Sequence, residues 1–261
     1  MKIKITVLQM LFVALFVFLT IPNLQGQNTD SLSLKKESQH FTFYSTEGDV
    51  AVLDSLAEIL ENNYTRITNQ LGIQIEKKIR VKVFPDIGSF HTAINYPNAP
   101  DWVVGSCVGD ELLLVSPLNP GSVHTYGSLM QVVIHEFVHI ALYKAIGDKV
   151  VTGLPKWLNE GYAQYEAGQI NEQIRKSVEI SMFEKMPPTW AQLNSASAME
   201  FGKINGYGLS VSIVEFLVVT YGTNKLVLLI KEPENIETIY GMPESTLEKQ
   251  WIHYVKHEKL D

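Results

Sequence analysis

Residues 134–140 read IHEFVHI and place two histidines and a glutamate inside a segment that is otherwise apolar. The flanking residues, LMQVVI and ALYKAI, are also largely apolar, so a helix over this region has no clean solvated face. We therefore predict a buried helix. A buried ionised carboxylate without a partner is costly, and unpaired imidazoles add to that cost. The folded protein must therefore provide interaction partners for His135, Glu136 and His139.

The spacing of these three residues indicates a metal. His135 and His139 are four residues apart, so on a helix they share one face and can converge on a single ion. Glu136 is rotated about a quarter-turn from them and can reach a water at that ion. This HExxH spacing supplies two zinc ligands and a general base. The alternative interpretation is a chance match built from ordinary core histidines.

A catalytic zinc takes a third protein ligand and keeps one position open for water. The stretch WLNEGYAQY, residues 157–165, places Glu160 twenty-one residues after His139 in the next predicted helix. Gly161 beside it removes a side chain where two helices must approach closely. We predict that His135, His139 and Glu160 hold one zinc ion. The alternative for Glu160 is a solvated helix glutamate.

Composition narrows the class of protein. The chain has 261 residues, of which 46% are hydrophobic and 19% charged, as in one globular domain or two tightly joined lobes. The net charge of −7 and the lack of a basic stripe argue against nucleic acid as a partner. A single cysteine, Cys107, excludes an intramolecular disulfide and is typical of a small buried strand residue.

The first 26 residues have the layout of a secretory signal peptide. Lys2 and Lys4 precede a short apolar run, and polar or small residues follow around Gly26. We expect cleavage of residues 1–26 and export to the periplasm or the extracellular space. A membrane is a partner only if this segment is retained as an anchor. Residues 27–39 then form a polar linker.

The remaining pattern predicts an α+β fold of one domain, residues 40–261. Its strand-rich lobe, residues 40–150, has strands near 40–46 and 77–85 and a strand pair within 102–117 that turns at 108–110. A helix over 50–71 ends at Gly72. A mainly helical lobe, residues 151–261, has helices near 155–168, 171–183 and 209–222 and a final one capped by Ser245 and Thr246.

Two motifs together resemble a known family. HEFVH at 135–139 and WLNEGYA at 157–163, with Gly-Tyr-Gly at 206–208 before an apolar helix, resemble the gluzincin metallopeptidases of the peptidase MA-like group. That group is similar to the catalytic domain of the zinc aminopeptidases, and the resemblance covers roughly residues 40–254. It implies a zincin-like fold, with a small mixed sheet and active-site helix followed by helices.

The resemblance also implies roles for particular residues. Zinc binds His135, His139 and Glu160, and Glu136 acts as the base. The strand at 111–116 lies along the cleft, so that substrate contacts come from a run of four residues: Glu111, Leu112, Leu113 and Leu114. The C-terminal helices form the other wall.

An oxyanion forms when water attacks a peptide carbonyl, and it needs a hydrogen-bond donor. Tyr207 is our candidate, because the resembling aminopeptidases place such a tyrosine at this helix start. It could equally be a core tyrosine, and His124 and Tyr126 are competing donors. Those aminopeptidases hold the substrate's amino terminus with a Gly-x-Met-Glu-Asn motif, which VVGSCVGDELLLVSP lacks. We therefore expect cleavage inside peptides.

Two functions fit these observations. The first is an exported zinc metallopeptidase that hydrolyses peptide or protein substrates, with Glu136 as general base. The second is a non-catalytic envelope protein that keeps the gluzincin lobe as a binding module. The sequence favours the first, because Glu136 contributes nothing to metal binding and a binding module has no need of it.

Overall fold

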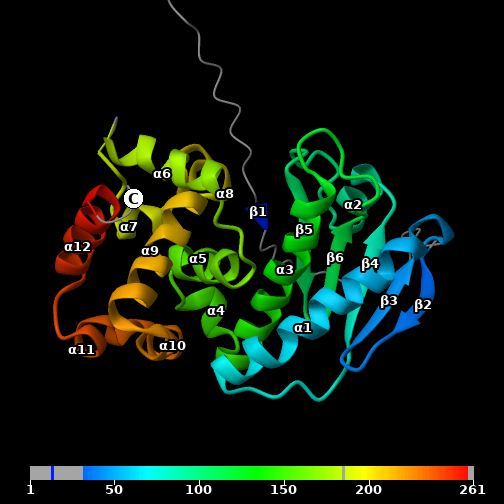
Figure 1. The fold of residues 1–261 in the computed structure, drawn as a ribbon, viewed down its shortest axis with the longest axis horizontal. Coiled ribbons are helices and arrows are strands. Elements are labelled where there is room, and N and C mark those ends of the chain that lie inside the picture. The colour runs from blue at the N-terminus through cyan, green and yellow to red at the C-terminus, as the bar shows by residue number, and fades with distance from the viewer. Residues whose placement is uncertain (1–12, 15–31, 184–185, 258–261) are drawn as a thin grey trace, which may run out of the picture.

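The protein has a small mixed sheet near its N-terminus and helices through the rest of the chain (Figure 1). The computed structural model describes residues 13–14, 32–183 and 186–257. The predicted α+β order of strands before helices is confirmed within these residues. The predicted signal peptide lies outside them, apart from residues 13 and 14.

Six strands of the described residues form one sheet, in the order β1-β5-β6-β4-β3-β2. These strands are β1 (Val13–Ala14), β2 (Ser33–Glu37), β3 (Phe41–Ser45), β4 (Ile79–Phe84), β5 (Val103–Val108) and β6 (Glu111–Val115). The pairs β3–β4, β4–β6 and β1–β5 are parallel, whereas β5–β6 and β2–β3 are antiparallel. Gly109, with a φ of +58°, makes the tight turn between β5 and β6.

The helices near the sheet are η1 (Glu47–Val52), α1 (Leu53–Leu71), α2 (Ile87–Ala93) and α3 (Tyr126–Ile146). The helical lobe holds α4 (Lys149–Thr152), α5 (Lys156–Glu166), α6 (Glu172–Phe183), α7 (Trp190–Ser195), α8 (Ala198–Lys203), α9 (Gly206–Tyr221), α10 (Thr223–Lys231), η2 (Pro233–Asn235), α11 (Ile236–Tyr240) and α12 (Glu244–His257). The short helices α4, α8, α10 and α11 were not predicted.

Two expectations from the sequence need correction. The stretch 27–39 is not only a linker, because residues 33–37 form β2 at the edge of the sheet, paired with β3. Its sequence SLKKE is polar because an edge strand exposes much of its surface. Ser245 and Thr246 lie inside α12, which begins one residue earlier, so they do not precede its first turn.

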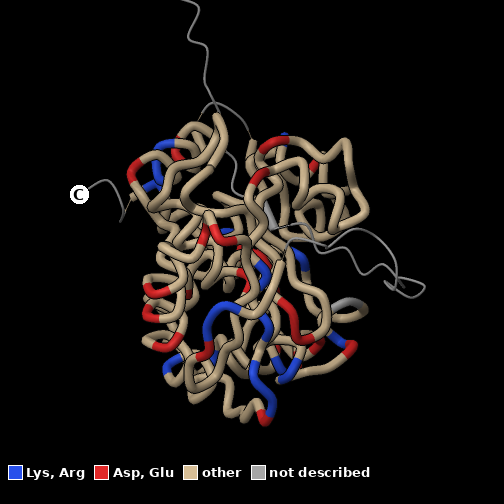
Figure 2. Tube along the Cα trace, turned by 90° about the vertical axis from the view of Figure 1, so that its right-hand side faces the viewer, with Lys and Arg blue, Asp and Glu red and all other residues tan. Residues whose placement is uncertain are grey.

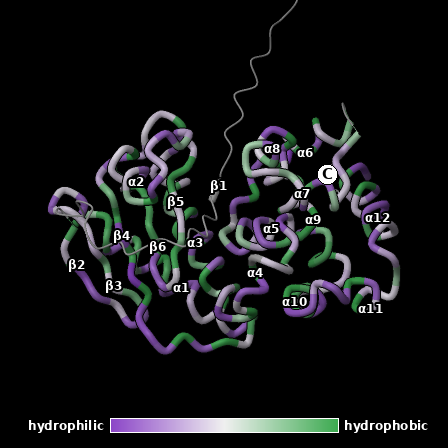
Figure 3. The backbone as a smooth tube through the Cα atoms, turned by 180° about the vertical axis from the view of Figure 1, so that it is seen from behind, coloured by the Kyte–Doolittle hydropathy of each residue, from purple (hydrophilic) through white to green (hydrophobic). Residues whose placement is uncertain are grey.

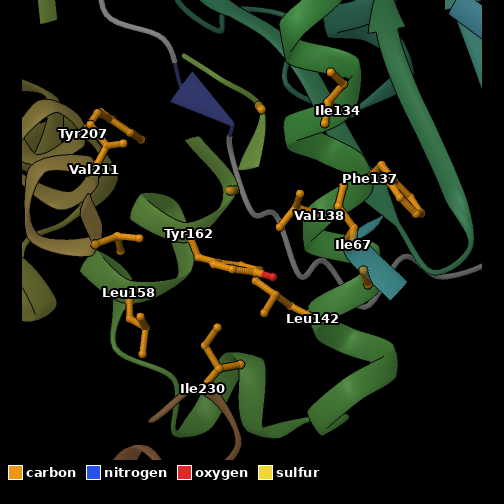
Figure 4. Close-up of a cluster of buried hydrophobic side chains, with 14 of the residues drawn as sticks. Ile67, Ile134, Phe137, Val138, Leu142, Leu158, Tyr162, Tyr207, Val211 and Ile230 are labelled. Atoms are coloured by element: carbon orange, nitrogen blue, oxygen red, sulfur yellow. The ribbon is translucent and has the colours of Figure 1, made fainter. Parts of the chain in front are cut away.

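The main hydrophobic core runs through both lobes without interruption. Figure 4 shows Tyr162 of α5 reaching toward α3, close to Val138 and Leu142, while Tyr207 and Val211 lie on α9. Figure 3 shows hydrophobic positions gathered in the central strands and hydrophilic stretches along the outer loops at the lower edge. Helix α3 is long and apolar enough to cross a membrane, but 72% of its apolar window is buried inside the protein, as in a core helix.

A polar cluster joins the sheet side of the molecule to α5. Arg66 of α1 forms an ion pair with Glu166 at the end of α5 and also donates to its carbonyl oxygen at 2.9 Å. Gln70 donates to Glu166 Oε1 at 2.6 Å and to the Tyr162 hydroxyl at 3.1 Å. This cluster satisfies the Glu166 carboxylate, which is only 2% exposed.

Charged side chains elsewhere lie mostly on the surface. Figure 2 shows Lys and Arg positions interspersed with Asp and Glu positions, with no stripe of one sign on the face in view. Several form exposed pairs, such as Lys36 with Asp54 and Lys78 with Glu37. Such pairs contribute little to stability individually.

Helices α5 and α9 meet at Gly161, which is why a glycine follows the predicted ligand Glu160. A Cβ atom on Gly161 would lie 2.4 Å from the carbonyl oxygen of Ser210 and 2.9 Å from a methyl group of Val214. The obstacle is main chain, so it cannot move aside cheaply. The absence of a side chain therefore sets the separation of α5 from α9.

Replacing Gly161 with alanine should lower the free energy of unfolding by about 1–3 kcal/mol, because α5 must move away from α9. Urea unfolding followed by circular dichroism measures the change. Gly127→Ala in the first turn of α3 is the matched control, since a Cβ there meets nothing within 4 Å. The control should be neutral or stabilising. Equal losses in the two variants would contradict this account of the helix contact.

Candidate metal centre

Helix α3 carries the HExxH residues deep in the protein. It begins with a reciprocal cap, in which Thr125 accepts from the Ser128 amide and Ser128 accepts from the Thr125 amide. This cap fixes where the helix starts and therefore which side chains face inward. His135, Glu136 and His139 are all at most 3% exposed. The predicted buried polar helix is confirmed.

Helix α5 brings the third side chain to the two histidines. Pro155 lies at its N-cap, and the helix starts one residue later than the predicted start at 155. Glu160 Oε2 lies 3.5 Å from His135 Nε2 and 3.9 Å from His139 Nε2. The two Nε2 atoms are 3.0 Å apart. The structure thus brings His135, His139 and Glu160 together as one buried group.

Two amide side chains orient the imidazole rings. His135 Nδ1 lies 2.9 Å from Gln169 Oε1, and His139 Nδ1 lies 3.0 Å from Asn159 Oδ1. An amide oxygen only accepts, so each Nδ1 carries the proton and donates it. Each Nε2 then directs a lone pair into the centre of the group. This is the tautomer that a metal-binding histidine requires.

The geometry of the group fits a divalent cation. Three ligand atoms about 2.1 Å from one tetrahedral ion lie roughly 3.4 Å apart. The three separations here, between 3.0 and 3.9 Å, bracket that value. Glu160 Oε2 is buried and has no hydrogen-bond partner among the described residues. Converging lone pairs without a donor repel one another, and a cation between them removes that repulsion.

Burial and the neighbouring charges shift the pKa values of the two histidines in opposite directions. Burial alone lowers the pKa of His135, but interaction with the Glu160 carboxylate 3.5 Å away and the charge of Glu136 outweigh it and raise that pKa. Burial lowers the pKa of His139 well below its ordinary value, and the charge of His135 lowers it further. His139 is therefore neutral, which is the form that binds a metal.

Glu136 lies beside β5. A Cβ atom on Gly105 would lie 2.7 Å from Glu136 Oε1, so the glycine provides the space for the carboxylate. Burial raises the pKa of Glu136 to about 8, with His135 opposing the shift and Glu160 adding to it. Oε1 is buried and makes no hydrogen bond to the described residues. A buried carboxyl group with a pKa near neutrality can exchange a proton with a substrate.

Tyr207 lies at the start of α9 and is 3% exposed. Burial raises its pKa well above the ordinary value, and the charges of Glu160 and Glu136 raise it further. The hydroxyl therefore stays protonated and lies within the electrostatic reach of both carboxylates. Its ring packs edge-on against Phe201, with centroids 4.8 Å apart. These contacts suit both a core tyrosine and a hydrogen-bond donor.

The two competing donors are His124 and Tyr126. His124 Nε2 is 3.2 Å from the Trp102 carbonyl, and burial lowers the pKa of its imidazole. Tyr126 is the first residue of α3 and is 44% exposed. It precedes His135 by nine residues, or about 13 Å along the helix axis. Tyr126 therefore lies more than two helical turns from His135, and the Trp102 carbonyl holds the His124 ring.

The expectation that the strand at residues 111–116 lies along the cleft is wrong. β6 lies between β4 and β5 and pairs with both, so its backbone groups are already in use. Leu112, Leu113 and Leu114 are buried in the core, and Glu111 pairs with Arg80 and Lys82 at 2.7 Å. Sheet order, which the sequence does not reveal, places β5 rather than β6 beside Glu136.

Sequence reasoning missed three residues that shape the site. Asn159 adjoins Glu160 and so lay within the motif already singled out. Gln169 follows a helix end and carries no pattern that distinguishes it. Gly105 lies in a strand, where an isolated glycine is a recognised sign of close approach by another group.

Cys107 also lies on β5, and burial raises its thiol pKa well above the ordinary value, with Glu136 and Glu160 adding to the shift. It is therefore a protonated thiol at neutral pH and not a reactive thiolate.

A comparison with protein families agrees with this geometry. The family model of the Peptidase MA superfamily matches residues 60–257, which include α3, α5 and α9. No curated protein matches the sequence.

The isolated protein should bind about one divalent ion per chain, and His139→Ala should weaken this binding by more than about 100-fold, beyond the effect of losing an orienting partner. Elemental analysis and competition with a chelating dye measure the affinity. His253→Ala is the control, because this exposed histidine on α12 does not belong to the buried His135–His139–Glu160 group. Equal affinity in wild type and His139→Ala would remove the metal centre as an explanation of the site.

Proposed function

Because the chain belongs to the peptidase MA superfamily, we propose that it is a zinc metallopeptidase of the gluzincin type that hydrolyses bonds inside peptides. One observation carries the proposal: a buried His135–His139–Glu160 group lies beside Glu136, whose Oε1 has no partner among the described residues. Binding a metal accounts for the first three side chains but not for the fourth. A role for Glu136 in proton transfer accounts for it.

Zinc held by the three ligands supplies Lewis-acid chemistry, which polarises a carbonyl group and lowers the pKa of water. The protein's own contribution begins with Glu136. Its carboxylate takes the proton of the attacking water at Oε1 and delivers it to the amine that leaves. Gln169 and Asn159 hold the imidazoles in the required tautomer. The apolar surroundings of α3 keep bulk water away, which strengthens these interactions.

Tyr207 is the proposed donor to the oxyanion. Its pKa responds to Glu136 and Glu160, so the hydroxyl shares their electrostatic environment. Gly206 and Gly208 on either side have no room for side chains, since a Cβ would lie 2.6 Å from Phe201 and 2.7 Å from Asn205. The start of α9 is thereby fixed, and a fixed donor is the kind that stabilises a developing charge.

An extended substrate would lie along β5. The residues Val13 and Ala14 already pair there, opposite Val103 and Gly105, so this edge accepts an extended chain. Gly105 adjoins Glu136, and a peptide on this edge passes the proposed base. The strand reads VVGSCV and offers no carboxylate for a terminal ammonium group. Glu111 is already paired with Arg80 and Lys82. These points favour internal cleavage.

Export remains part of the proposal and is supported by the signal-like residues 1–26. Removal of that segment would also free the edge of β5 for substrate. The expected location is the periplasm or the extracellular space. Attachment to a membrane applies only if the segment is retained.

Glu136→Gln should abolish peptide hydrolysis while zinc stays bound, because the base is lost and the three ligands are not. Digestion of a peptide library and elemental analysis of the same sample measure the two properties. Wild-type rates in the variant would show that another group accepts the proton. A zinc-loaded wild type that cleaves nothing would favour the non-catalytic binding module instead.

Tyr207→Phe should lower kcat by roughly ten- to a thousand-fold with zinc content unchanged, as for loss of one oxyanion donor. Steady-state kinetics on a fluorogenic peptide measure this. Phe201→Leu serves as a packing control, since it removes the ring that Tyr207 contacts but leaves the hydroxyl. An unchanged kcat in Tyr207→Phe would return the residue to a purely structural role.

Internally quenched peptides with acetylated N-termini should be cleaved at least as fast as unblocked aminoacyl substrates, because β5 has no anchor for an ammonium group. The two substrate classes can be compared in one plate assay. Turnover confined to the unblocked class would contradict internal cleavage.

A further inference from the structure

Lys156 is a charged side chain on the same helix face as Glu160. It is the first residue of α5, four residues before the proposed ligand, so the two side chains are neighbours one turn apart. Its ammonium group donates to the Ala196 carbonyl and lies 5.7 Å from the centre of the Phe201 ring. Phe201 packs edge-on against Tyr207. Contacts therefore run from Lys156 through Phe201 to Tyr207.

The charge of Lys156 has no ion-pair partner among the described residues. Five other lysines form ion pairs, and they are Lys35, Lys36, Lys78, Lys82 and Lys144. The side chain is half-buried, and burial lowers its pKa, while the charges of Glu160 and Glu200 oppose that shift. A half-buried cation held by one carbonyl and one ring retains donors for an anion.

Two carboxylates lie near this cation, but each has another role. Glu160 belongs to the metal group. Glu200 caps α8, where its Oε2 accepts from the Ser197 amide at 3.0 Å and from the Ser197 hydroxyl at 2.8 Å. A third carboxylate, supplied by a ligand, would give Lys156 an ion-pair partner.

We propose that Lys156 makes this protein prefer substrates with a carboxylate close to the bond that is cleaved. This inference rests on the proposed peptidase function. Lys156 and Glu160 are separated by about 6 Å along the helix axis, and an extended peptide advances about 3.3 Å per residue. The recognised carboxylate therefore lies within about two residues of the scissile bond. It belongs either to an Asp or Glu side chain or to the C-terminus of a short peptide.

Matched peptides test the preference. A blocked parent peptide is varied as Glu, Gln or Lys at each of two positions on either side of the cleaved bond. A second series ends in a free carboxylate at the same distances, which distinguishes a C-terminus from a side chain. We expect wild type to prefer the carboxylate at one position by about three- to tenfold in kcat/KM. Equal rates for Glu and Gln at every position, with no gain from a free C-terminus, would overturn the proposal.

Substitutions at Lys156 test whether this residue causes the preference for a carboxylate. Lys156→Gln should remove it, and Lys156→Glu should reverse it toward Lys. The control is Lys203→Glu, the same charge change on an exposed residue of the neighbouring α8, which should leave it unchanged. Melting curves and zinc content establish that each variant is folded. A preference that survives in a folded Lys156→Gln variant would also overturn the proposal.

A second variant keeps the test decisive if substitutions at Lys156 prevent folding. Glu200→Gln leaves a residue that can still cap α8 but removes a competing negative charge. It should strengthen the preference for a carboxylate two- to threefold. No change, or a weaker preference, would count against the role of Lys156.

A measurement of peptide binding tests this inference independently of the proposed activity. Fluorescence anisotropy measures the affinity of labelled Glu and Gln peptides for zinc-loaded Glu136→Gln protein, which should not turn over. If wild type hydrolyses no peptide, the proposed function fails, and the anisotropy decides the inference by itself. Tighter binding of the Glu peptide that is lost in Lys156→Glu supports it, and equal binding refutes it.

Discussion

The fold depends on providing partners for three buried side chains that carry lone pairs inside an apolar helix. His135, Glu136 and His139 would be costly in α3 without partners. A second helix, α5, supplies Glu160 and Asn159, and Gln169 follows just after its end. Helix α5 must therefore lie close to α3, and Gly161 lets α9 approach α5 on another side. The relative positions of α3, α5 and α9 are therefore coupled to one polar cluster.

Much of this cluster could be predicted because its signals are local in the sequence. A spacing of four fixes the relation of His135 to His139 on any helix. Glu160 was recognisable because a charged residue stood among Trp157, Leu158 and Gly161, all of which belong in a core. Gln169 had no such context, since it contacts His135 only after the chain has turned back at Gly168. Its role depends on tertiary structure.

The order of the strands in the sheet could not be predicted from local sequence patterns. The strands themselves follow from alternation, but their order depends on pairing between distant segments. The resemblance to the aminopeptidases implied that β6 is a cleft strand, yet β4 and β5 cover both of its edges. β2 was missed because its polar residues suit both a linker and an exposed edge strand. A metal motif constrains the residues around it, whereas it leaves the order of the strands open.

The link between α1 and α5 has a consequence for motion. Arg66 and Gln70 bind Glu166 at the end of α5, and one continuous core underlies both lobes. A hinge between the lobes would have to break this ion pair, whose Glu166 side chain is buried, and shear that core, so domain closure around a ligand is disfavoured. For the proposed peptidase, a folded substrate would therefore have to unfold locally to reach the metal group, and specificity would depend on how readily a segment of the substrate unfolds.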